Sequence, residues 1–192
     1  DRIADFIKDK HNPTYLSDIM FDVERIEFSS DINKVCTEAD TLLLAMPSPY
    51  VKEHLKKISV DISDKYIVTA IKGIVPDENA IVTRYMADFY GVKPEKEIVI
   101  GGPCHAEEVA LGRQSYLTIG CSEIETAKTF ANCLKGKKLR TVVSTDTDGI
   151  EYGAVLKNVY AIGAGIIYGL KNGDNFLAMF VSNAIREMDN FL

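Results

Sequence analysis

Short runs of strand-forming residues recur along the first three quarters of the chain, and segments with helical spacing separate them. The runs lie at residues 42–45, 66–68, 98–100, 116–119 and 141–143. Between the second and third runs, Ile81, Tyr85 and Phe89 repeat at the four-residue interval of one helix face. Strands that alternate with helices are typical of parallel βα units, and runs that are apolar throughout indicate strands covered on both faces. The pattern predicts an α/β domain with a doubly wound parallel sheet.

One helix start is marked after the fourth run. Ser122 is followed three residues later by Glu125, which is the spacing of a capping box, and apolar residues at helical intervals come next. Gly136 follows the last of them and predicts the end of that helix.

The pattern changes after Asp148, where strand signals stop. Two long helical stretches, at about residues 149–170 and 175–192, run to the last residue given. We therefore expect a domain boundary near residues 145–148. An α/β domain would occupy residues 1–146, and the first helices of an all-α domain would occupy residues 147–192.

The composition narrows the classes of function. The formal net charge of -6 and the isoelectric point near 5.1 argue against a nucleic-acid surface or an anionic membrane surface, because both require clustered cations. The first residues lack the basic flank and apolar stretch of a signal peptide, so a cytoplasmic location is expected. We expect no metal site and no disulfide, because no CxxC pair or zinc-type spacing joins the four cysteines, Cys36, Cys104, Cys121 and Cys133.

A single formal charge interrupts the apolar stretch at residues 152–170, and it belongs to Lys157. A helix that is apolar on every side is expected to be buried, and a buried ammonium is disfavoured unless it is paired, hydrated or lowered in pKa. A membrane span is disfavoured because Lys157 and Asn158 would lie in its middle. A lysine that reaches from a buried helix to the surface stays an alternative. Gly153 and Ala154 are small enough for a ligand to approach, which favours a cleft beside the helix.

Residues 149–187 closely resemble the start of the helical domain in glycerol-3-phosphate dehydrogenases, and Leu-Lys-Asn-Val at residues 156–159 is similar to that family's signature. Two upstream segments agree with the family in order and spacing: Ala-Ile-Lys-Gly-Ile at residues 70–74, and Gly-Gly-Pro-Cys-His-Ala-Glu-Glu-Val at residues 101–109. Residues 43–50 look like the strand and loop beneath the family's cofactor. The resemblance covers essentially the whole chain.

The resemblance implies a Rossmann-like cofactor domain, a helical substrate domain and a hydride exchange between NAD(P)H and dihydroxyacetone phosphate that yields sn-glycerol 3-phosphate for phospholipid synthesis. It implies that Lys157 is the general acid/base at the ketone oxygen. Lys72 would lie at a strand's carboxyl end, where open α/β sheets bind ligands, and would face both cofactor and substrate. A second ammonium beside Lys157, together with burial, would lower the pKa of Lys157.

The same resemblance implies roles for further positions. Gly102, Cys104 and Asn158 would contact the substrate, and Asn158 would also orient Lys157 or the loops at the sheet's end. The cofactor would meet Tyr50, near its nicotinamide ring, and Ala106. NAD and NADP both remain possible cofactors, since the residues that would recognise the ribose 2′ position are not evident. The family also implies a homodimer.

The chain departs from the family pattern at two adjacent positions. Cys104 replaces the usual Ser or Thr, and His105 replaces Phe. A thiol is a weaker hydrogen-bond donor than a hydroxyl, which weakens the expected contact from Cys104. We interpret His105 as a packing substitution.

The sequence contains no GxGxxG motif, which seats the pyrophosphate in Rossmann domains. We therefore expect these residues alone to bind cofactor poorly and to be inactive, and turnover of NADH with dihydroxyacetone phosphate by this chain would contradict that.

Three alternatives stay open. A related dehydrogenase could act on another hydroxy acid or sugar phosphate. A cysteine enzyme could use Cys104 for acyl transfer, although a helical neighbour such as His105 points about 100° away and is badly placed to take its proton. A non-catalytic interaction domain would leave Lys157 without a purpose.

Overall fold

The computed structural model describes residues 2–192 and contains one five-stranded sheet in the order β1-β2-β3-β4-β5. Each predicted run forms a strand. The strands are β1 (Thr41–Leu44), β2 (Tyr66–Thr69), β3 (Glu97–Gly101), β4 (Ser115–Gly120) and β5 (Leu139–Ser144).

Eight α-helices and three short 3-10 helices surround and extend the sheet in the described residues. The α-helices are α1 (Arg2–Asp9), α2 (Ile32–Glu38), α3 (Val51–Leu55), α4 (Val82–Tyr90), α5 (Ala106–Ala110), α6 (Ile124–Leu134), α7 (Thr147–Gly169) and α8 (Asp174–Phe191). The 3-10 helices are η1 (Val23–Arg25), η2 (Ser48–Tyr50) and η3 (Pro94–Lys96).

The strand directions differ from the prediction at one junction. β1, β2 and β3 are parallel, but β4 is antiparallel to β3, with Ile100 opposite Ile119. β5 is again parallel to β4. A parallel crossover has to carry the chain back along the sheet. The five-residue helix α5 in the β3–β4 connection is too short for this, whereas the eleven-residue α6 spans the β4–β5 crossover.

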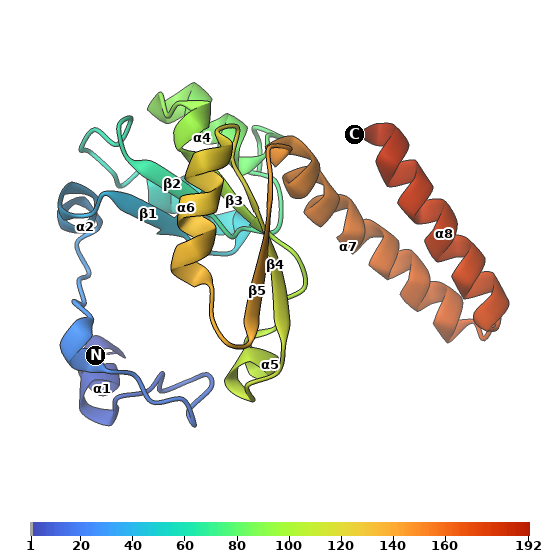
Figure 1. The fold of residues 1–192 in the computed structure, drawn as a ribbon, viewed down its shortest axis with the longest axis horizontal. Helices are drawn as coiled ribbons and strands as arrows, with labels where there is room; N and C mark the ends of the chain where they lie inside the picture. The colour runs from blue at the N-terminus through green and yellow to red at the C-terminus, as the bar shows by residue number, and fades with distance from the viewer. Residues whose placement is uncertain (1) are drawn as a thin grey trace.

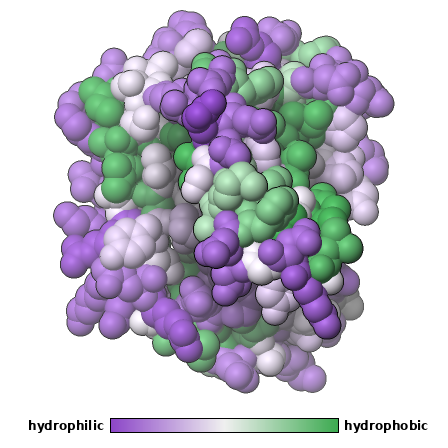
Figure 2. Space-filling model, turned by 90° about the vertical axis from the view of Figure 1, so that its right-hand side faces the viewer, coloured by the Kyte–Doolittle hydropathy of each residue, from purple (hydrophilic) through white to green (hydrophobic). Residues whose placement is uncertain are grey.

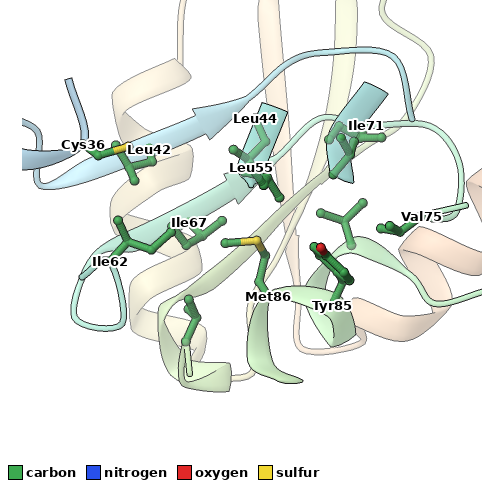
Figure 3. Packing of buried hydrophobic residues seen from close by; sticks show 13 residues of the cluster. Cys36, Leu42, Leu44, Leu55, Ile62, Ile67, Ile71, Val75, Tyr85 and Met86 are labelled. Carbon is green, nitrogen blue, oxygen red and sulfur yellow. The ribbon is translucent and has the colours of Figure 1, made fainter. Parts of the chain in front are cut away.

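Both faces of the sheet are covered by helices, as the doubly wound prediction requires. Neighbouring residues of β2 show this, because Ile67 and Val68 point to opposite faces and belong to different buried clusters. On the first face, Tyr85 and Met86 of α4 point toward the strands (Figure 3). On the second face, α6 packs against β4 and β5. β1 is covered on one face alone in the described residues, since its Leu43 is 56% exposed.

The capping box expected at Ser122 is wrong. The residue before α6 is Glu123, whose side chain accepts a hydrogen bond from the backbone N–H of Glu125 at 3.2 Å. A glutamate carboxylate satisfies a free N–H at a helix start as a serine hydroxyl would, so the helix begins one residue later than the pattern suggests.

The two long helices predicted after the sheet are confirmed as α7 and α8, which form a hairpin. Asp146 starts α7 by accepting a hydrogen bond from the Gly149 N–H at 2.8 Å. Figure 1 shows α7 leaving one side of the sheet and α8 folding back beside it. Tyr160 Oη donates to Glu187 Oε2 at 2.8 Å and joins the two helices. No helix in residues 2–192 has the length and apolar character needed to cross a membrane.

The expectation that the apolar helix α7 is buried is wrong for most of its length. Within α7 and α8, the buried residues are Glu151, Ile167 and Ala184. Seen from the side of the hairpin, hydrophobic surface lies open among hydrophilic side chains (Figure 2). A pair of helices has too few facing positions to enclose a helix that is apolar all round.

Candidate active site at the ends of the strands

A cavity of about 480 Å³ lies where the carboxyl ends of β2 and β3 meet the first half of α7. Its lining comes from Lys72 after β2, Gly101 at the end of β3 and residues 102–105 after it, Thr118 of β4, and residues 150, 153, 154, 157 and 158 of α7. Open α/β sheets bind ligands at this edge. Gly153 and Ala154 contribute to the wall, as the expected cleft beside the helix requires.

Gly102 shapes the loop that enters the cavity after β3. Its φ of +102° lies in a region that side chains rarely adopt, and an added Cβ would lie 2.9 Å from the carbonyl oxygen of Tyr116. Both constraints require glycine here. The turn places Pro103, Cys104 and His105 along the cavity wall.

Lys72, which follows β2, is held by the neighbouring strand β3. Its Nζ donates a hydrogen bond to the carbonyl oxygen of Ile100 at 2.6 Å. Desolvation lowers the pKa of Lys72, and the nearby positive charge of Lys157 lowers it further, while Cys104 and Glu151 act in the opposite direction. The two lysines therefore line one cavity, and the charge of Lys157 acts on Lys72 across it.

Lys157 lines the cavity, but the expectation that it is buried is wrong. The residue is exposed, and no ion pair or hydrogen bond joins its ammonium to another described residue. The cause is the position of α7, which contacts the sheet near its start and α8 along one side. Lys72 is also exposed, but desolvation lowers the pKa of its ammonium.

The other predicted site residues divide into two groups. Gly102, Cys104 and Asn158 line the cavity, whereas Tyr50, in η2, and Ala106, the first residue of α5, do not. No hydrogen bond joins the Asn158 side chain to Lys157 in the described part of the chain.

His105 is not the packing residue that the sequence suggested. It is exposed and lines the cavity beside Cys104. As the residue before the short helix α5, it lies in a loop that faces the cavity rather than in a buried layer.

Sequence reasoning missed Glu151. It is 5% exposed, and its carboxylate accepts hydrogen bonds from Val82 and Thr83 at the start of α4. Burial raises its pKa, and the bonds from Thr83 and Val82 oppose that change. The signal was available, because Glu151 is a charged residue six positions before Lys157 on the same helix.

Two family descriptions match the chain end to end. Residues 1–148 match the NAD-dependent glycerol-3-phosphate dehydrogenase N-terminus, and residues 146–192 match the corresponding C-terminus. The chain belongs to the NAD-dependent glycerol-3-phosphate dehydrogenase family. The resemblance inferred from the sequence is thereby confirmed, and the two matched regions meet at the N-terminus of α7.

Curated relatives bear similar names. The chain is 31% identical over 179 residues to "Glycerol-3-phosphate dehydrogenase [NAD(P)+]" of Lysinibacillus sphaericus, covering 92% of this chain and 53% of the relative. It is 30% identical over 185 residues to the protein of that name in Streptococcus sanguinis, covering 95% of this chain and 54% of the relative. The chain thus spans about half the length of the curated relatives it matches.

Solved structures in this family share the fold. Glycerol-3-phosphate dehydrogenase from Coxiella burnetii has a TM-score of 0.83 at 24% identity, over 98% of this chain and 57% of that one. The Plasmodium falciparum enzyme has a TM-score of 0.87 at 21% identity, over 97% of this chain and 52% of that one. The Rossmann-like α/β fold class is confirmed, with the one change of strand direction between β3 and β4.

Proposed function

We propose that the protein interconverts dihydroxyacetone phosphate and sn-glycerol 3-phosphate with NAD(P)H. The observation that carries this proposal is the pairing of Lys72 and Lys157 on one cavity at the carboxyl ends of parallel strands. Two ammonium groups suit a phosphorylated ketone, since one can bind negative charge while the other exchanges a proton. Family membership favours this reaction over acyl transfer by Cys104 and over a related dehydrogenase activity.

Lys157 acts as the proton-transfer group in this proposal. Its ammonium gives a proton to the ketone oxygen at carbon 2 during reduction, and its free amine removes that proton during oxidation. Lys72, fixed by its bond to Ile100, holds negative charge on the substrate beside it. Gly102, Cys104 and Asn158 contact the substrate from the loop after β3 and from α7.

The cofactor end of the site rests on residues that follow parallel strands. Tyr50 is an exposed aromatic ring after β1, and Lys72 follows β2, which fits the carboxyl-end location of nicotinamide cofactors in open sheets. Ala106 would contact the cofactor at the start of α5. NAD or NADP, when bound, supplies or accepts the hydride at carbon 2.

The wider assignment follows from the family. Residues 1–146 would form part of the cofactor-binding domain, and residues 147–192 would begin the substrate domain. We infer a cytoplasmic homodimer that supplies glycerol 3-phosphate for phospholipid synthesis. Sedimentation of the natural protein that carries these residues tests the dimer, and fractionation of its cells tests the location.

Replacement of Lys157 tests the reaction. In the natural protein, Lys157→Ala should lower the rate of NAD(P)H oxidation with dihydroxyacetone phosphate by roughly a hundredfold or more, because the general acid is lost. Lys137→Ala is the matched control, since this exposed lysine lies in the α6–β5 turn and outside the cavity. Unchanged turnover in folded Lys157→Ala would assign Lys157 to structure.

A further inference from the structure

The start of α4 is capped by a side chain from a distant part of the sequence. The residue before the helix is Ile81, which has no side-chain acceptor for the free N–H groups of the first turn. Glu151 supplies the missing acceptors: Oε1 accepts from the Val82 N–H at 3.1 Å, and Oε2 accepts from the Thr83 N–H at 3.3 Å and from the Thr83 hydroxyl. This carboxylate joins α7 to α4.

Ile150, the neighbour of Glu151, seats α7 on the sheet. An added Cβ on Gly101 of β3 would lie 2.5 Å from Ile150 Cγ2, and one on Gly120 of β4 would lie 2.6 Å from Ile150 Cδ1. The two strands therefore leave room for this side chain at their crossing with α7. Ile150 and Glu151 together fix the base of the helix in two directions, one toward the sheet and one toward α4.

The cavity wall follows one side of α7 upward from this base. Ile150, Gly153, Ala154 and Lys157 line the cavity, and they are spaced by three, four and seven residues, as on one helix face. The elements that α7 contacts most are α8, β3 and β4. The direction in which Lys157 points toward the cavity therefore depends on how residues 150 and 151 are held.

We propose that Glu151 is a positioning residue: by clamping the base of α7 to the N-terminus of α4, its carboxylate fixes Lys157 in the cavity that Lys72 shares. The role is defined for the proposed dehydrogenase reaction and so rests on it. Glu151 is placed to act through Lys157, since its carboxylate is occupied by Val82 and Thr83. Its negative charge also raises the pKa of Lys72, opposite to the effect of Lys157.

The decisive measurement is the electrostatic coupling between the two lysines. In the natural protein with ¹³C at lysine Cε, the pKa of Lys72 is titrated by NMR, and Lys157→Gln should raise it by removing the neighbouring charge. The same pair of titrations is then made in a Glu151→Ala background. The missing carboxylate changes the pKa of Lys72 directly in both titrations of that pair. This direct effect therefore cancels from the difference between them. In the Glu151→Ala background, we expect Lys157→Gln to raise the pKa of Lys72 by less than about half as much as in wild type.

Asp148→Asn is the matched control, because it removes the same charge from the first turn of α7 at an exposed residue that makes no hydrogen bond or ion pair with α4 in residues 2–192. It should leave the coupling intact. Glu151→Ala should also lower kcat by roughly tenfold or more, because Lys157 is misplaced, with KM for NAD(P)H within about twofold. Equal coupling in wild type and folded Glu151→Ala, or equal loss in Asp148→Asn, overturns the proposal.

A second variant covers a failure of Glu151→Ala to fold. Glu151→Gln keeps the size of the side chain but cannot accept all three hydrogen bonds on its single oxygen, so the coupling should fall here too. Unchanged coupling in folded Glu151→Gln overturns the proposal. If wild type shows no reduction of dihydroxyacetone phosphate, the proposed function fails by itself, while the lysine titrations still decide whether Glu151 positions Lys157.

Discussion

The sheet with its covering helices and the α7–α8 hairpin are both rich in apolar residues, yet they bury them very differently. In the sheet half, two clusters of buried side chains fill the space between strands and helices on opposite faces. In the hairpin, three residues are buried, and apolar side chains such as Val159, Ile162 and Ile166 are exposed. An apolar sequence shows that a segment needs partners, while burial depends on how many partners surround it.

The difference also separates two kinds of order. A sheet residue such as Ile119 is held by neighbours from several elements, so its position is determined many times over. The hairpin is positioned by the few contacts at the base of α7 and by its own helix pairing. The catalytic lysine proposed here belongs to the second, less constrained region.

Truncation of matched isoleucines should give the largest contrast. Ile119→Ala removes a side chain that is 0% exposed in the core, whereas Ile162→Ala removes one that is 68% exposed on α7. We expect the first to lower the free energy of unfolding by about 2–5 kcal/mol and the second by about 0.5 kcal/mol or less. Urea unfolding of both variants measures the difference. Equal losses would mean that the hairpin face is covered in solution.

A second prediction concerns a buried carboxyl group in the sheet half. Glu97 begins β3, is 6% exposed, and its Oε1 has no hydrogen-bond partner among the described residues. Burial, followed by repulsion from Glu151, raises the pKa of Glu97 to about 8 against the weaker opposing effect of Arg84. The folded state therefore favours the protonated carboxyl, and stability is lost as pH rises from the ordinary glutamate pKa toward 8.

Glu97→Gln should remove this loss. At pH 9 the variant should be more stable than wild type by about 1–3 kcal/mol, and the gap should close as pH falls toward 5, where the wild-type carboxyl costs nothing extra to bury. Unfolding curves at several pH values measure the gap. Glu95→Gln, at an exposed neighbour in η3, is the control and should show no such trend. A gap independent of pH would show that Glu97 does not titrate in this range.

The smallest expected effect comes from replacing either of two glycines of α7 by alanine. A Cβ on Gly165 would meet no atom within 4 Å, whereas one on Gly163 would lie 2.6 Å from Phe180 Cζ of α8. Gly165→Ala should therefore stabilise the hairpin by about 0.5–1 kcal/mol, because alanine loses less backbone entropy in a helix. Gly163→Ala should give no gain, since Phe180 has to move. Hydrogen exchange of α7 amides measures both, and a similar gain from each would show that the helices do not pack as described.

Local patterns were sufficient to predict the five strands, the two long helices and the doubly wound arrangement, because burial on both faces leaves apolar runs. They were insufficient for the direction of β4, which depends on whether the connection after Gly101 can span the sheet. They also misplaced the start of α6, because the carboxylate of Glu123, and not the hydroxyl of Ser122, accepts a hydrogen bond from the first turn.

The candidate site was predictable where residues follow strand ends in sequence. One cavity brings together Lys72, Gly102, Cys104, Lys157 and Asn158. The first and the last of these residues lie 86 positions apart in the sequence. The roles of all these residues stay predictions, and Tyr50 and Ala106 also lie outside the cavity. The burial of Lys157 was wrong because it was inferred from the composition of its own helix. Glu151 escaped notice because its partners, Val82 and Thr83, lie 69 and 68 positions away.

Because Ile150 is seated against Gly101 and Gly120, any tilt of α7 takes place about its base. With a rise of 1.5 Å per residue, Lys157 lies roughly 10 Å along the axis from Ile150, and the far end of α7 lies roughly 30 Å away. A swing of about 10° would move the far end by about 5 Å but Lys157 by about 2 Å. Lys157 therefore moves less than the outer end for the same swing, but a displacement of about 2 Å is still large enough to slow proton transfer, so the contacts at the base set the accuracy of the site.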